Sequence, residues 1–199
     1  MTIPLFTNRL EIREFDRNDR GRLLQIVSNS QFSFYAFPPP NASGENMGDA
    51  IDNFLDNIEL KRQPDRVTGI RENYKLAICL KKTRELIGYV ALDEISEAHN
   101  EMRDIGYFID PLYWSKGYAT EAALTLLEEL APIISNNSVW ATVHPENCRS
   151  QAVLRKLGFV DTSDRTVNKA GEPRLIFERT APKLPSIRTP AVPIRGVEA

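Results

Sequence analysis

The segment from Arg103 to Leu127, RDIGYFIDPLYWSKGYATEAALTLL, constrains the fold of this chain more than any other. Residues 104–109 have the composition of a strand that ends at Pro111, and a short loop follows. Apolar residues then recur at helical spacing over 118–130, with Pro132 just beyond them. We expect Leu124, Leu127 and Leu130 to form the buried stripe of this helix. Strand, loop and helix in this order are typical of a crossover unit in an α/β sheet.

The flanking segments predict further strands and helices. Before the crossover unit we expect a strand over 9–15, a helix capped by Asp19, a helix over 47–58, and a hairpin of strands 74–80 and 86–95. After it we expect a strand over 139–143, a helix over 150–157, and a hairpin of strands 159–162 and 174–178. The predicted order is β-α-α-β-β-β-α-β-α-β-β, an α/β fold of the α+β type: one mixed sheet with helices on both faces.

Length and composition fit one soluble domain. The chain has 199 residues, with 27 acidic and 25 basic side chains, so no charge pattern for nucleic acid is expected. Two cysteines and two histidines predict neither a disulfide framework nor a structural metal site. Because no apolar run reaches about 18 residues, we expect no membrane association and a cytoplasmic location.

We expect one domain over residues 1–180 and a separate tail over 181–199. The tail holds four prolines and few large apolar residues. It is predicted to be extended or disordered, or else to lie against a neighbouring subunit of a homodimer.

The loop before the central helix carries the first chemical signal. Gly117 and Ala119 stand where the helix begins, and neither has a bulky side chain. The free amides and the dipole of a helix start favour a bound anion, and Lys116 would add positive charge. The sequence has neither the Gly-x-x-x-x-Gly-Lys-Ser/Thr pattern of a nucleoside-triphosphate loop nor Gly-x-Gly-x-x-Gly.

The motif WSKGYATEA, Trp114 to Ala122, resembles the pyrophosphate loop of the GNAT acetyltransferases, and of their RimJ/RimL-like branch in particular. Four further stretches are similar to that family in the same order along the chain: TNRLEIREF, ELIGYVAL, DIGYFIDP and NCRSQAVLRKLGF. The resemblance implies the GNAT acyl-CoA N-acyltransferase fold. It also implies an N-acetyltransferase that uses acetyl-CoA as cosubstrate, without a metal.

The same resemblance implies which residues bind the coenzyme. Backbone groups of Tyr107, Phe108 and Ile109 would pair with the pantetheine arm as an added strand would. Loop amides would hold the pyrophosphate, and Asn147 would bind the arm. The loop and helix residues concerned are Trp114, Ser115, Lys116, Gly117, Tyr118, Ala119, Thr120 and Asn147. The side chains of Trp114 and Tyr118 are expected to pack rather than to bind ligand.

Two residues are candidates for catalysis. Asp104 matches the family's general base, which an alkyl ammonium with a pKa of about 10 requires at neutral pH. Ser150 matches the general acid of RimL-type enzymes, because Leu154 stands where many relatives have tyrosine. The amide of Phe108 or Ile109 would stabilise the thioester oxyanion. Alternatively, Asp104 is a solvated strand residue and Ser150 only caps a helix.

The resemblance leaves the acceptor open. A primary amine would attack acetyl-CoA directly in a ternary complex, and this amine is either a protein N-terminus or a small molecule. The alternative is a non-catalytic module that holds acyl-CoA as a sensor or scaffold, which the absence of the usual tyrosine favours.

Overall fold

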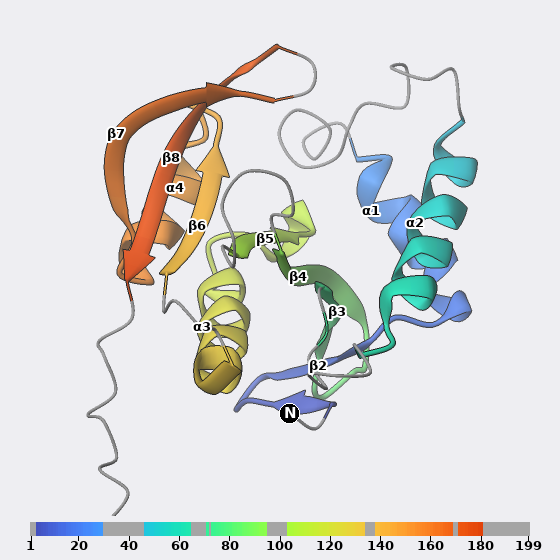
Figure 1. Ribbon diagram of the computed structural model, residues 1–199. Helices are drawn as coiled ribbons and strands as arrows, with labels where there is room; N and C mark the ends of the chain where they lie inside the picture. Colours follow the sequence, from blue (N-terminus) through green and yellow to red (C-terminus); the bar gives the residue numbers. More distant parts are fainter. Residues whose placement is uncertain are drawn as a thin grey trace, which may run out of the picture.

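The computed structural model describes residues 3–29, 46–64, 71, 73–94, 103–133, 138–168 and 171–180 (Figure 1). The strands are β1 (Leu5–Phe6), β2 (Leu10–Glu14), β3 (Asn73–Leu80), β4 (Leu86–Glu94), β5 (Arg103–Ile109), β6 (Ser138–Val143), β7 (Val160–Val167) and β8 (Pro173–Thr180). The α-helices are α1 (Arg20–Val27), α2 (Met47–Lys61), α3 (Tyr118–Leu130) and α4 (Cys148–Lys156). The tail predicted over 181–199 lies outside the described residues.

All these strands form one sheet in the order β1-β2-β3-β4-β5-β6-β8-β7. Neighbouring strands are antiparallel except β5 and β6, which run parallel and are connected through α3. The predicted mixed sheet and its crossover unit are therefore confirmed. The two-residue strand β1, which pairs with β2 at the edge, was not predicted.

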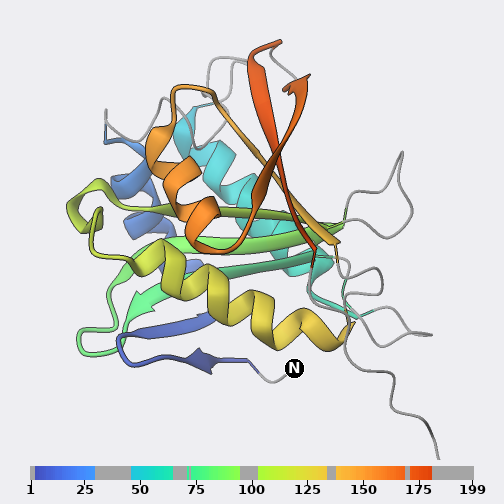
Figure 2. The same ribbon diagram turned by 90° about the vertical axis from the view of Figure 1, so that its left-hand side faces the viewer.

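The parallel pair β5 and β6 separates soon after it forms. The two strands are in register only at Arg103 opposite Val139 and at Asp104 opposite Trp140. Beyond these two positions β5 stays paired with β4 as far as Ile109, while β6 is paired with β8 as far as Val143. The sheet therefore opens into two halves along β5, and Figure 2 shows β6, β7 and β8 angled away from the strands β2 to β5.

Helices cover both faces of the sheet, as the sequence predicts. The helices α3 and α4 pack on one face, where they bury Leu126, Leu127 and Leu154 against strand residues such as Ile105. On the opposite face α1 and α2 bury Leu23, Ile51 and Leu55 against Ala77 and Phe108. Alternation along β5 explains why Ile105 and Phe108 belong to different layers.

The prediction that Asp19 caps α1 is wrong. Asp19 precedes the helix, but its side chain makes no cap hydrogen bond there. Its carboxylate instead accepts two hydrogen bonds from the Arg13 guanidinium, both 2.8 Å long, and one from the backbone N–H of Asp16. Asp16 caps a single 3-10 turn, Arg17–Asp19, that leads into α1. The bidentate pair with Arg13 thus takes the oxygens that a cap would use.

Two predictions about helix details are also corrected. Leu124 is 37% exposed, and the buried face of α3 is formed by Ala122, Ala123, Leu126, Leu127 and Leu130. Alanines let the helix lie close to the sheet, which a search for large apolar residues overlooks. Helix α4 begins at Cys148 rather than Ser150, because the Asn147 side chain caps it by accepting from the Ser150 N–H.

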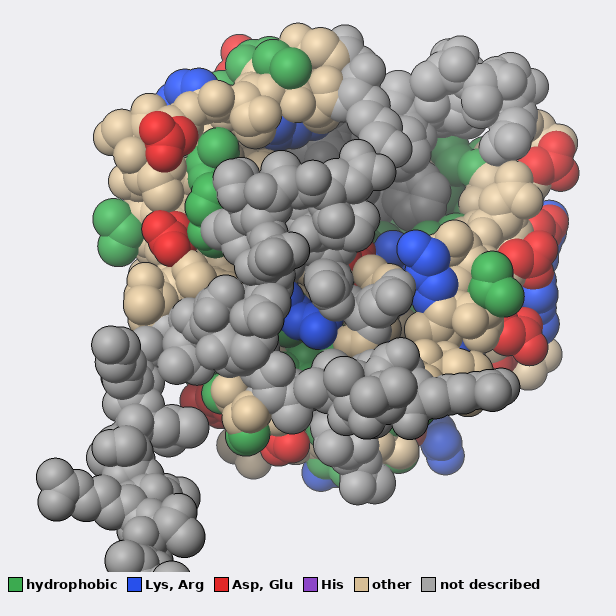
Figure 3. Space-filling view, viewed as in Figure 1, with side chains coloured by type: hydrophobic (Ala, Val, Ile, Leu, Met, Phe, Trp, Pro, Cys, Tyr) green, Lys and Arg blue, Asp and Glu red, His purple; other side chains and the backbone are tan. Residues whose placement is uncertain are grey.

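Charges of both signs alternate on the outer surface of α1, α2 and the 3-10 turn that precedes α1. Arg17 pairs with Asp56 and Glu59, and Arg20 pairs with Asp52. Figure 3 shows red and blue side chains intermixed along the edge where these helices lie. Among the described residues, no helix is long and apolar enough to cross a membrane.

Gly88 marks the closest approach of β4 to β5. A Cβ atom at this position would lie 2.1 Å from the carbonyl oxygen of Phe108 and 3.0 Å from the Cα atom of Ile109. The register between β3 and β4 also shifts here, since Ile78 pairs with Gly88 and Cys79 with Leu86. Both neighbouring atoms belong to the backbone, so no side-chain rotation can relieve the overlap.

We therefore expect Gly88→Ala to lower the free energy of unfolding by about 2 kcal/mol, which corresponds to a fall in Tm of roughly 4–8 °C. Gly21→Ala is the matched control, because a Cβ atom there meets nothing within 4 Å and the residue is exposed on α1. The free energy of unfolding of the control should be unchanged or higher by up to about 1 kcal/mol. Thermal unfolding measures both variants. Equal Tm values for the two variants would contradict the close approach.

Candidate active site

The loop between β5 and α3 exposes backbone amides at the start of the helix. Ser115 and Gly117 have positive φ angles of 60° and 80°, and Gly117 is the residue before the first helical position. The first backbone hydrogen bond of the helix runs from the Glu121 N–H to the Gly117 carbonyl, at 3.0 Å. The amides of Tyr118, Ala119 and Thr120 therefore have no acceptor within the helix and suit an anion.

The turn between β1 and β2 holds this loop in place through Glu121. Its carboxylate accepts from the Thr7 hydroxyl at 2.5 Å and from the Arg9 Nε at 2.7 Å. Arg9 also donates to the carbonyl of Lys116 and lies over the ring of Tyr118. Burial raises the pKa of Glu121, but the bonds from Thr7 and Arg9 outweigh it and hold that pKa below its usual value. Glu121 thus ties the first turn of α3 to the segment that contains Thr7 and Arg9.

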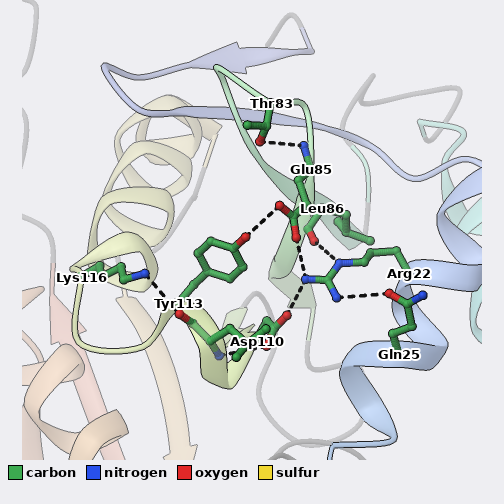
Figure 4. A network of polar contacts seen from close by, with 9 residues as sticks. Arg22, Gln25, Thr83, Glu85, Leu86, Asp110, Tyr113 and Lys116 are labelled. Carbon is green, nitrogen blue, oxygen red and sulfur yellow. Dashed lines mark hydrogen bonds and ion pairs between the residues drawn. The ribbon is translucent and has the colours of Figure 1, made fainter.

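A second network fixes the other end of the loop. The Arg22 guanidinium of α1 binds the carboxylate of Asp110 at 2.5 Å and that of Glu85 at 2.9 Å (Figure 4). The Tyr113 hydroxyl donates to the second oxygen of Glu85 at 2.8 Å. Asp110 is 2% exposed and also accepts from the Leu112 N–H, which starts a 3-10 turn over Pro111–Tyr113. Arg22 therefore neutralises a buried carboxylate at the point where β5 becomes the loop.

A cavity of about 1040 Å³ extends from this loop along β5. Its walls are residues 105–109 of β5, the loop, the end of β6 and one side of α4. Tyr89 and Phe108 contribute from the layer of α1 and α2, whereas Tyr107 and Ile109 contribute from the layer of α3 and α4. Because β5 and β6 separate here, the cavity is lined from both layers and runs between the halves of the sheet.

The ladder between β4 and β5 determines which backbone groups of β5 face the cavity. The Asp110 N–H donates to the Ile87 carbonyl, and the antiparallel register pairs Phe108 with Tyr89 and Gly106 with Ala91. Alternation then turns the amides of Tyr107 and Ile109 away from β4, toward the cavity. The backbone of Phe108 faces β4, so of the three predicted residues only Tyr107 and Ile109 can offer amides. The Trp114 indole N–H already binds the Ile109 carbonyl, at 2.6 Å.

Two hydroxyl groups meet on the α4 side of the cavity. The Tyr107 Oη atom lies 3.0 Å from the Ser150 Oγ and 3.2 Å from the Ser150 carbonyl oxygen. Burial raises the pKa of Tyr107 to about 12, although the bond to Ser150 opposes the shift. Leu154, one turn further along α4, is 1% exposed and contributes no polar atom. Sequence reasoning gave a role to the backbone of Tyr107 but none to its side chain. The signal that could have placed the side chain on the α4 side is its alternation with the apolar residues Ile105 and Ile109.

Two carboxylates lie opposite each other on the face of the sheet that α1 and α2 cover. Asp104 on β5 is the cross-strand partner of Asp93 on β4, and one oxygen of each is buried without a hydrogen-bond partner among the described residues. Burial and the charge of Asp93 raise the pKa of Asp104 to about 7. Burial, followed by the charges of Asp93 and Asp104, also raises the pKa of Tyr89, which lines the cavity.

Eleven of the thirteen predicted site residues line the cavity, and the other two do not. Lys116 is exposed, and its ammonium group donates to the Leu112 carbonyl at 3.2 Å and lies over the ring of Tyr113. Asp104 adjoins the lining residues Ile105 and Gly106. Sequence reasoning missed Arg149, which lines the cavity and stacks on Trp114, with 4.7 Å between the guanidinium carbon and the ring centre.

Asn147 and Ser150 are both at the start of α4. The Asn147 side-chain oxygen accepts from the Ser150 N–H at 3.0 Å, so Asn147 is the capping residue and Ser150 is not. The Ser150 hydroxyl remains in contact with Tyr107. Among the described residues, no three metal-binding side chains gather at one place.

Comparison with known proteins places this geometry among acetyltransferases. A family described as acetyltransferase (GNAT) domain matches residues 9–160. The chain is 30% identical over 153 residues to the uncharacterized N-acetyltransferase YnaD of Bacillus subtilis, which covers 77% of this chain and 80% of YnaD. It is 24% identical over 150 residues to the spermidine N(1)-acetyltransferase of Escherichia coli, covering 75% and 72%.

Solved structures show the same fold at lower identity. The structure of RimL, a ribosomal L7/L12 alpha-N-protein acetyltransferase in complex with coenzyme A, has a TM-score of 0.70 and 18% identity to this chain. The match covers 90% of this chain and 98% of RimL. The predicted fold and the predicted likeness to RimL are thus confirmed.

We expect Arg22→Ala to lower the free energy of unfolding by about 3 kcal/mol, because it leaves the carboxylate of Asp110 buried and unpaired. Arg17→Ala is the control: it removes an ion pair with Asp56 whose side chains are 55% and 60% exposed, and should cost less than about 1 kcal/mol. Urea unfolding measures both. Similar losses in the two variants would contradict a special role for Arg22.

Proposed function

The chain belongs to the GNAT acetyltransferase family, and we propose that it transfers the acetyl group of acetyl-CoA to a primary amine by direct attack in a ternary complex. The observation that carries this proposal is the cavity between β5 and β6. It joins the open amides of α3 to the layer that holds Asp93 and Asp104. A coenzyme entering beside α3 and an amine entering beside α1 and α2 could therefore meet within it.

The coenzyme side of the cavity suits a diphosphate and an extended arm. The amides of residues 115–120 supply donors at the positive end of the α3 dipole. Arg149, Lys156 and Arg174 line the cavity and would attract further phosphate charge. Beyond Asp104, β5 has no pairing with β6, so its amides can receive an arm as an added strand.

The two amides of β5 that face the cavity would bind different parts of the coenzyme. The amide of Ile109 is nearer the phosphate-binding loop and would pair with the arm. The amide of Tyr107 lies two residues further from the loop and would donate to the thioester oxygen as its negative charge develops.

Asp104 would act as the general base for the amine. An alkyl ammonium has a pKa of about 10, so it must lose a proton before it can attack. A carboxylate with a pKa of about 7 is a stronger base than an ordinary aspartate and is still partly ionised at neutral pH. Asp93 beside it adds negative charge that favours a cationic acceptor. Relatives named for spermidine and for a ribosomal protein N-terminus are both consistent with such an acceptor.

A thiol-release assay with acetyl-CoA and a panel of amines tests the proposed transfer. The panel should contain polyamines, amino sugars and peptides with free N-termini. Amine-dependent release of CoA supports acetyl transfer. Tight CoA binding without release from any acceptor would instead support the sensor or scaffold, which the buried Leu154 at the usual tyrosine position favours.

We expect Gly117→Glu to weaken CoA binding by at least about a hundredfold, because it puts bulk and negative charge among the amides of the loop. Gly171→Glu is a matched control: both glycines have φ near 80°, but Gly171 lies at the β7–β8 turn, away from the cavity. Isothermal titration calorimetry measures both affinities. Equal weakening in the two variants would show that backbone strain, not the loop, is responsible.

The base role of Asp104 predicts a pH dependence. In the wild type, kcat/KM should rise as the pH passes through about 7, because the carboxyl group must lose its proton to accept one from the amine. Asp104→Asn should lower kcat/KM about a hundredfold and abolish this rise. Asp93→Asn keeps the base but removes the neighbouring charge, so it should move the rise to lower pH. An unchanged profile in Asp104→Asn would exclude this residue as the base.

A further inference from the structure

The leaving sulfur of acetyl-CoA needs a partner that α4 does not supply in the usual way. Leu154 offers no proton donor, and the nearest hydroxyl on that helix belongs to Ser150. A serine hydroxyl has a single hydrogen and can rotate it toward several acceptors. Without a restraint, the Ser150 hydrogen would point to the sulfur only part of the time.

Tyr107 supplies such a restraint. Its hydroxyl lies 3.0 Å from the Ser150 Oγ and 3.2 Å from the Ser150 carbonyl oxygen, so both acceptors within reach belong to one residue. Either hydroxyl could be the donor in this contact. The phenol is the more acidic of the two, which favours Tyr107 as the donor and the Ser150 Oγ as the acceptor. When the Ser150 oxygen accepts this bond, its own hydrogen is directed away from Tyr107.

The strand and the helix hold the two groups rigidly. Tyr107 is on β5, whose ladder with β4 runs from Arg103 to Ile109. Ser150 is in the first turn of α4, where its N–H is bound by the Asn147 cap. The motif Asn147-Cys148-Arg149-Ser150 therefore fixes the backbone of the serine, while Tyr107 orients its hydroxyl.

We propose that Tyr107 is a positioning residue that acts through Ser150: its hydroxyl donates to the Ser150 Oγ and so directs the Ser150 O–H at the departing sulfur. This inference rests on the proposed acetyl transfer. As the amine nitrogen bonds to the acetyl carbon, the C–S bond breaks and its electron pair stays on sulfur. The Ser150 O–H stabilises that charge by a hydrogen bond. The proton lost by the amine leaves through Asp104 to solvent, and solvent supplies the thiol proton of free CoA.

The high pKa of Tyr107 is consistent with this role. A phenol whose pKa is about 12 stays neutral throughout the working range, so it remains a donor and does not lose its proton to a thiolate with a pKa of about 8.5. Tyr107 therefore orients and polarises Ser150 without being consumed as an acid.

Kinetics of single and double variants test the proposal. Tyr107→Phe should lower kcat about tenfold and leave KM for acetyl-CoA within about twofold. Ser150→Ala should lower kcat further, and the double variant should be no slower than Ser150→Ala, because Tyr107 acts only through the serine. Tyr74→Phe, the same change at a buried position outside the cavity, is the control and should have wild-type kinetics. If kcat of the double variant falls by the product of the two single-variant losses, the proposal is overturned.

A binding measurement tests it without an acceptor. The ultraviolet absorbance of the thiolate reports the titration of CoA bound to the protein. Ser150 should lower the pKa of the bound thiol in the wild type, and both Tyr107→Phe and Ser150→Ala should raise it toward that of free CoA. An unchanged midpoint in Tyr107→Phe overturns the role of Tyr107 even if the protein transfers acetyl groups. Failure of the wild type to bind CoA would overturn the proposed function as well.

Discussion

The separation of β5 from β6 is the feature on which the rest of the site depends. Two strands that are parallel neighbours at Arg103 and Asp104 no longer pair beyond them. Each keeps its other neighbour, so the sheet remains continuous while one edge of β5 has no neighbouring strand beyond Asp104. A cavity lined from both layers can exist only because of this opening. The loop before α3, the two hydroxyls and the two carboxylates then lie around β5, which itself contributes Tyr107 and Asp104.

Because side chains alternate along β5, the residues with proposed chemical roles lie on two different faces of this strand. Odd-numbered residues, Tyr107 among them, face α3 and α4, and even-numbered residues, Asp104 among them, face α1 and α2. The groups that would assist the leaving sulfur and the group that would deprotonate the amine therefore come from opposite faces of one strand. Such a division keeps an acidic and a basic function apart while the reacting atoms meet between them.

Local patterns in the sequence predicted most elements and the position of the loop before α3. Helical spacing was enough to predict α3, and the loop motif was enough to indicate which amides would be free. Local patterns failed where a distant residue decides the outcome. Asp19 has the right place for a cap, but Arg13 binds its carboxylate. Leu124 fits the helical period, but alanines form the face that meets the sheet.

The candidate site shows the same limit. The motif at the start of α4 identified Ser150, because its residues are adjacent in the chain. The partner of that serine, Tyr107, is 43 residues away, and the carboxylate facing Asp104 comes from a different strand. Both contacts depend on the register of β5, which no pattern within one segment specifies.

The clamp at Glu121 has a consequence for how the protein is made. Thr7 and Glu121 are separated by 114 positions, so the first strands must wait for more than half of the chain to be synthesised before their polar partner exists. The start of α3 is therefore clamped only after a contact between two distant parts of the chain has formed. The order of synthesis and the order of assembly therefore differ at the loop before α3.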